Sequence, residues 1–154
     1  MNRAHADILL AEDNPSDTEL FVDCLAAVVD PRRIHRVHDG VEALDFLFCR
    51  GSYKARDPAT PVRLALLDIK LPRVDGLEVL ERLRADSRTC VVPVVMFTSS
   101  NVERDVARAY RLHANGYVQK PVDFDRFRGV VQALGHYWLS INEPPPGVTR
   151  AGCP

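Results

Sequence analysis

The stretch LLDIKLPRVDG, Leu66–Gly76, decides the fold together with the residues that precede it from Val62. The run VRLALL is almost wholly apolar, which is typical of a strand that helices cover on both faces. The run ends on one carboxylate, Asp68, before a turn that closes with Asp75 and Gly76. A single aspartate after a strand is most often a turn former or a helix cap. Its meaning therefore depends on the residues that stand after the other strands.

Strand-like and helical patterns alternate along the chain. The predicted strands are residues 6–11, 33–38, 62–67, 92–97 and 116–119. The predicted helices are residues 15–29, 41–49, 77–85, 102–113 and 123–141. This alternation predicts an α/β fold with a doubly wound parallel sheet and helices on both faces. The second strand, RIHRVH, is half polar, which suits an edge.

Two stretches fall outside this alternation. Residues 50–61 form a long polar connection with two prolines, and long connections in compact domains are often functional or mobile. Residues 143–154 contain PPPG and show no apolar periodicity. We expect one folded domain over residues 1–142 and a disordered tail over 143–154. We therefore expect no output domain that binds DNA or carries an enzyme after Ile141.

Composition excludes several classes of protein. The net charge of −1 provides no field for nucleic acid or anionic lipid, and no apolar run approaches the roughly 20 residues of a transmembrane helix. The N-terminus carries no signal peptide pattern, so we expect a cytoplasmic protein. The four cysteines form no Cys-x-x-Cys pair, which argues against a zinc site.

Polar residues follow four of the five predicted strands. Glu12 and Asp13 follow the first strand, Asp68 the third, Thr98 the fourth and Lys120 the fifth. The carboxyl ends of parallel strands meet at one rim of the sheet. Three carboxylates brought together there call for a cation, and oxygen ligands favour Mg²⁺ over zinc. With a hydroxyl and an ammonium, the set has the parts for phosphoryl transfer, in which one carboxylate is the nucleophile.

The motifs ED, LLDIKLPRVDG, FTSS and YVQKP resemble the receiver domain of two-component response regulators from about Ile8 to Leu139. The run HDGVEALDFL and the polar loop after it resemble single-domain regulators paired with bacterial phytochrome histidine kinases. The resemblance implies a flavodoxin-like sheet of order 2-1-3-4-5. It also implies a signalling protein rather than an enzyme, although receivers catalyse their own phosphorylation and dephosphorylation.

The resemblance also implies a role for each residue at the rim. Asp68 would accept a phosphoryl group from a sensor histidine kinase. Mg²⁺ would be held by Glu12, Asp13, Asp68 and the backbone carbonyl of Lys70. Thr98 and Lys120 would bind phosphoryl oxygens, and Tyr117 would be the switch aromatic that rotates inward. The bond from Lys120 to Pro121 is commonly cis in the family.

The helical patterns also bear on partners. The predicted core stripe of the last helix comprises Phe124, Phe127, Val131, Leu134 and Trp138. A second apolar stripe comprises Val130, Ala133, Tyr137 and Ile141. Arginines at 104, 108 and 111 form a basic stripe, whose simplest interpretation is a solvated face and whose alternative is an interface. In the family this face forms dimers, so we expect a symmetric homodimer through the fourth helix, fifth strand and fifth helix. The expected interface residues are Arg104, Arg108, Arg111, Asp123, Val130 and Tyr137.

The first helix has a similar ambiguity. Its predicted core stripe is Leu20, Cys24, Ala27 and Val28, which leaves Phe21 and Leu25 outside it. These two residues either pack in the ordinary way or, by the resemblance, form part of a docking surface for the kinase.

Two other classes of protein fit this sequence less well than the receiver does. A Mg²⁺-dependent aspartyl-phosphate phosphatase of the haloacid dehalogenase type carries D-x-D after its first strand, where this chain reads EDNP. The best nucleophile candidate of this chain, Asp68, follows the third strand instead. A flavodoxin-like cofactor binder needs a hydroxyl or glycine loop after the first strand, which here is acidic. Both classes are disfavoured.

Overall fold

The computed structural model describes residues 6–146 of the 154-residue chain. The strands are β1 (Ile8–Ala11), β2 (Ile34–Val37), β3 (Leu64–Leu67), β4 (Val94–Thr98) and β5 (Gly116–Gln119). The helices are α1 (Pro15–Leu25), α2 (Gly40–Leu47), α3 (Gly76–Arg84), α4 (Glu103–Arg111) and α5 (Phe124–His136). Shorter turns are η1 (Pro31–Arg33), η2 (Gly51–Tyr53) and the π-helical η3 (Tyr137–Ile141).

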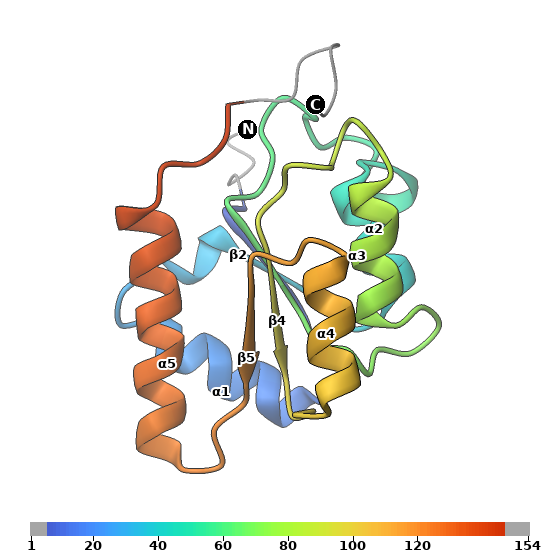
Figure 1. Cartoon of the computed structure of the whole chain (residues 1–154). Helices are drawn as coiled ribbons and strands as arrows, with labels where there is room; N and C mark the ends of the chain where they lie inside the picture. Colours follow the sequence, from blue (N-terminus) through green and yellow to red (C-terminus); the bar gives the residue numbers. More distant parts are fainter. Residues whose placement is uncertain (1–5, 147–154) are drawn as a thin grey trace.

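The strands form one parallel sheet in the order β2-β1-β3-β4-β5, which confirms the predicted fold and places β2 at an edge. Helices α1 and α5 cover one face, while α2, α3 and α4 cover the other (Figure 1). Each face has its own hydrophobic cluster. Among the described residues, no helix is both long and apolar enough to cross a membrane. The predicted tail is described only to Pro146, and residues 143–146 have no regular secondary structure; residues 147–154 lie outside the described part.

Strand register brings the rim residues to one level. Ala11 of β1 pairs with Leu67 of β3, so the residues that follow them, Glu12 and Asp68, leave neighbouring strands side by side. Toward the opposite edge of the sheet, Thr98 of β4 pairs with Gln119 of β5, which is the residue before Lys120. The register of the parallel strands therefore brings these polar residues together at one rim of the sheet, as the sequence predicted.

A close approach of α3 to β3 fixes the position of Asp68. Gly76 begins α3, and a Cβ atom added there would lie 2.0 Å from the backbone oxygen of Asp68. The Gly76 N–H donates to the carbonyl of Ile69 at 2.8 Å. Only a residue without a side chain lets the helix start this near the strand end. The Asp75 side chain caps α3 by accepting from the Glu78 N–H at 2.9 Å.

At the opposite end of the sheet, one guanidinium joins several segments. Arg84, the last residue of α3, donates from Nη1 to the carbonyls of Cys90 and Val92, at 3.0 and 2.8 Å. Its Nε donates to the carbonyl of His113 at 3.1 Å, and its Nη2 to Oδ1 of Asn115 at 3.0 Å. Since His113 and Asn115 connect α4 to β5, Arg84 fixes the C-terminal end of α4.

The predicted core face of the first helix is only partly correct: Cys24 is buried and Leu20 packs against the core cluster, but the other two predicted residues do not. Phe21 and Leu25 are buried, whereas Ala27 is exposed and Val28 is 50% exposed. The helix ends at Leu25 rather than at residue 29, so Ala27 and Val28 lie in the turn that follows it. Phe21 packs edge-on against Phe97 of β4. Ordinary packing is therefore the correct interpretation of Phe21 and Leu25.

The two predicted stripes of the last helix are largely confirmed: Leu134 and Trp138 pack against the core cluster, while Ala133 and Tyr137 are exposed. Phe127 and Val131 are buried as expected, but Phe124 is 52% exposed, because it is the first residue of α5 and lies past the end of the sheet. Val130, predicted to be exposed, is half-buried and packs against the core cluster. The π-helical turn η3 carries Leu139 into the core, while Ile141 stays exposed.

Candidate functional site

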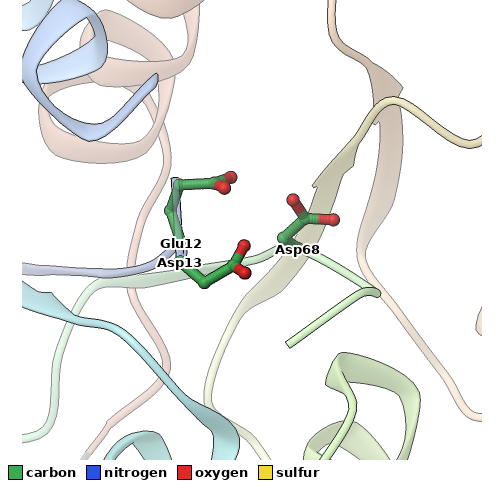
Figure 2. Close-up of side chains that lie close together, drawn as sticks. All are labelled: Glu12, Asp13 and Asp68. Atoms are coloured by element: carbon green, nitrogen blue, oxygen red, sulfur yellow. The ribbon is translucent and has the colours of Figure 1, made fainter. Parts of the chain in front are cut away.

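Three carboxylates meet at the rim of the sheet. Glu12 and Asp13 follow β1 and Asp68 follows β3, and their side chains point toward one another (Figure 2). One carboxylate oxygen from each of the three residues can be chosen so that all three lie within 4.8 Å of one another. Glu12 and Asp68 are buried, while Asp13 is exposed. A cluster of oxygen donors with one open side fits a hard divalent cation such as Mg²⁺, and the cluster contains none of the nitrogen or sulfur ligands that zinc prefers.

An ammonium lies among these acids. Lys120 Nζ donates to Glu12 Oε2, to Asp68 Oδ2 at 2.9 Å and to Asp17 Oδ2 at 3.2 Å. The Lys120 side chain is only 8% exposed. Each of the three N–H donors of the ammonium thus has a carboxylate partner. The sequence prediction missed Asp17, which lies within the first turn of α1 rather than at a strand end.

The acids respond differently to this environment. Burial raises the pKa of Glu12 to about 7, although the hydrogen bond from Lys120 opposes the shift. Burial would also raise the pKa of Asp68, but hydrogen bonds from Glu12, Lys120 and Thr98 outweigh it and hold that pKa below its usual value. Burial opposes the charge on Lys120, but its hydrogen bonds to both acids raise its pKa. Asp68 therefore stays ionised beside a charged ammonium, as a carboxylate nucleophile must.

The predicted hydroxyl and aromatic residues are linked through one loop residue. Thr98 is buried at the end of β4, and its Oγ1 accepts from the Ser100 N–H at 3.3 Å. The Tyr117 hydroxyl donates to the Ser100 carbonyl at 2.8 Å. The Ser100 hydroxyl donates to Asp105 Oδ2 in α4, also at 2.8 Å. The loop after β4 is thus tied to β5 and to the first turn of α4.

Lys70 lies beside the acceptor through its backbone. Its N–H donates to Asp68 Oδ1 at 3.3 Å, and the residue is exposed. No cis peptide bond occurs in residues 6–146, so the bond from Lys120 to Pro121 is trans and the cis expectation from the family is wrong for this structure. The trans form is the lower-energy isomer of such bonds, and Lys120 reaches all three carboxylates from it.

The predicted interface residues lie on α4, at the start and middle of α5, and in η3. Arg104, Arg108 and Arg111 are exposed on α4, and Arg108 pairs with Glu81 of α3 at 3.6 Å. Asp123 caps α5 by accepting from the Arg126 N–H. The dimer stays a prediction.

Comparison with known proteins identifies relatives with the same fold. Residues 8–132 match the response regulator receiver domain family. The response regulator Rcp1 of Synechocystis is 33% identical over 86% of this chain and 88% of its own length. Its Mn²⁺-bound crystal structure superposes with a TM-score of 0.82, covering 90% of this chain and 97% of that one.

Two further solved structures are similar to this chain. The phosphorylated cyanobacterial phytochrome response regulator RcpA is 34% identical, with a TM-score of 0.84 and coverage of 92% and 99%. The bacteriophytochrome response regulator AtBRR is 44% identical, with a TM-score of 0.69 and coverage of 90% and 99%. The family match covers most of the chain, and the acids, hydroxyl and lysine at the rim lie within it. The chain therefore belongs to the response regulator receiver domain family and is similar to phytochrome response regulators.

Proposed function

We propose that Asp68 accepts a phosphoryl group from a phosphohistidine of a sensor histidine kinase. The observation that carries this proposal is a buried, ionised Asp68 that contacts Lys120 and lies beside two further carboxylates. An Asp68 oxygen attacks phosphorus, the bond from phosphorus to the histidine nitrogen breaks, and the nitrogen leaves with the electron pair. The phosphoryl oxygens then gain hydrogen bonds from Lys120 and Thr98.

The metal ligands in this proposal are the carboxylates of Glu12, Asp13 and Asp68 and the carbonyl of Lys70. A bound Mg²⁺ would neutralise charge on the phosphoryl oxygens. The Mn²⁺-bound structure of the relative Rcp1 supports a divalent cation at this kind of site. The similarity to AtBRR and RcpA supports a bacterial phytochrome histidine kinase as the partner, and a cytoplasmic location follows from that role.

Phosphorylation of Asp68 is proposed to act on the loop after β4. Converting a carboxylate into an acyl phosphate adds negative charge and acceptor oxygens, which compete for the Thr98 hydroxyl. Thr98 now accepts from Ser100, and Ser100 contacts both Tyr117 and Asp105. A displacement of Thr98 therefore reaches β5 and α4 through one residue. We further propose that this region, with α5, forms the face that binds a second copy of the chain, within a receiver that spans residues 1–142.

Acetyl phosphate and Mg²⁺ provide the direct test. Wild-type protein should gain one phosphoryl group by intact mass, and Asp68→Asn should gain none. Asp75→Asn is the matched control, because Asp75 caps α3 at the same rim and asparagine is an equally good cap. An adduct that persists in Asp68→Asn, or is absent from wild type, would contradict the assignment.

A further inference from the structure

Asp17 contacts Lys120 but has no part in the roles described above. Its Oδ2 accepts from Lys120 Nζ at 3.2 Å, and its side chain is 38% exposed. The other two partners of Lys120, Glu12 and Asp68, are buried. Asp17 is therefore the solvent-facing member of the group of carboxylates around the ammonium.

The N-terminal capping hydrogen bonds of α1 do not use the Asp17 carboxylate, although an acid in the first turn also suits the helix dipole. An acid at this position commonly accepts a hydrogen bond from the N–H of the capping residue. Here the Asn14 N–H donates to Glu12 Oε1 at 3.1 Å. The Asn14 side chain in turn caps the helix by accepting from the N–H groups of Ser16 and Asp17. Because α1 is capped without the Asp17 carboxylate, that carboxylate is available to Lys120.

Lys120 does not need Asp17 in order to stay buried at the rim of the sheet. Lys120 is held by burial, by its hydrogen bond to Asp68 and by the Phe97 ring, whose centroid lies 6.0 Å from Nζ. A partly exposed ion pair such as the one with Asp17 adds little to this. Removing the Asp17 charge should therefore leave Lys120 at the rim and remove one of the three carboxylates that attract its ammonium.

In the phosphorylated form, only one of the three carboxylates would still be free to hold Lys120. Glu12 belongs to the metal set and Asp68 becomes the acyl phosphate, which leaves Asp17. We propose that Asp17 is a positioning residue that acts through Lys120: it draws the ammonium toward α1 and competes with the phosphoryl oxygens. Its negative charge also repels the phosphoryl group. The inference rests on the proposed function of Asp68 and adds a residue that opposes phosphoryl binding.

Beryllofluoride, which mimics a phosphoryl group on a carboxylate, tests this by calorimetry in Mg²⁺. Asp17→Asn should bind the mimic about threefold or more tightly than wild type, since one exposed ion pair and one repulsion are removed. Glu19→Gln is the matched control, an exposed acid on the same helix, and should bind as wild type does. Equal or weaker binding by Asp17→Asn would overturn the inference. Failure of wild type to bind would instead contradict the proposed function, and this inference with it.

A second measurement separates action through Lys120 from a local effect on α1. A double-mutant cycle compares the unfolding constants of wild type, Asp17→Asn, Lys120→Met and the double variant without metal. A contact between the two side chains predicts a coupling of about twofold or more in the unfolding constant. Strict additivity would show that Asp17 does not act through Lys120 and would overturn the proposal.

Discussion

Glu12 and Asp68 follow neighbouring strands, yet their carboxyl groups ionise at different pH. Both are buried, but the pKa of Glu12 rises to about 7 while that of Asp68 falls. The two groups interact, so a proton taken up by the pair is held by Glu12. This division keeps the proposed nucleophile ionised near neutral pH, and it makes the proposed metal ligand Glu12 the group that titrates.

The pKa of Glu12 predicts the pH dependence of metal binding. A carboxylate must lose its proton to bind Mg²⁺, so affinity should fall as pH is lowered through about 7, by up to about tenfold per pH unit. Calorimetry at pH 8 and pH 6 measures this, and Mg²⁺ binding at pH 6 should release a proton. In Glu12→Gln, affinity should be weaker and nearly independent of pH in this range. Equal wild-type affinity at the two pH values would contradict the prediction.

The sequence indicated most of this site because most of its residues stand directly after buried strands. Asp68, Thr98 and Lys120 could be placed on one rim from chain order alone, since parallel strands end at one edge. Asp17 could not be placed, because its contact with Lys120 depends on the rotation of α1 about its axis. Hydrogen-bond geometry and pKa also depend on burial, which a linear pattern does not contain.

Among the elements, the sheet was predictable and the helix faces were only partly so. Strands β1, β3 and β4 are apolar runs followed by polar residues, and the half-polar β2 fits its place at an edge. Helices α1 and α5 carry apolar residues on more than one face, so their patterns allow two rotations, and contact with the sheet selects Phe21 and Leu25. In α5, the π-helical turn that follows changes the residue spacing and brings Leu139 inward, which a 3.6-residue period cannot predict.

Two glycines in helices should respond oppositely to alanine. Gly76→Ala places a Cβ atom 2.0 Å from the Asp68 backbone oxygen and should cost about 3 kcal/mol or more of unfolding free energy. Gly129→Ala in α5 has no atom within 4 Å of the new Cβ and should stabilise by about 0.5–1 kcal/mol. Urea unfolding compares the two. A well-tolerated Gly76→Ala would show that the approach of α3 does not fix the acceptor.

At the scale of the whole molecule, most of the large exposed apolar side chains of the described residues lie on or next to α4, α5 and η3. Tyr110 of α4 is 54% exposed, Phe124 of α5 is 52% exposed, and Tyr137 and Ile141 of η3 are 45% and 58% exposed. Together with the exposed arginines of α4, they provide both apolar and charged groups for a partner. These side chains support the proposed dimer face, although Val130 contributes less to it than the sequence suggested.

Sedimentation tests the dimer. Wild-type protein should sediment as a dimer at micromolar concentration, and Tyr137→Glu should shift it to monomer because a buried unpaired charge opposes association. Ala27→Glu, an exposed position in the turn after α1, is the control and should leave the dimer intact. Monomeric wild type, or identical behaviour of all three proteins, would rule out this face.

The guanidinium of Arg84 makes the C-terminal end of helix α4 better anchored than its N-terminal end. It holds the segment after α4, whereas the first turn of α4 has no side-chain cap at Val102 and depends on Asp105 and Ser100. Helix α4 held in this way can tilt about its C-terminal end but cannot shift along its axis. Because Thr98 reaches α4 through Ser100 and Asp105, a displacement of Thr98 would move the first turn of α4 most and the end held by Arg84 least.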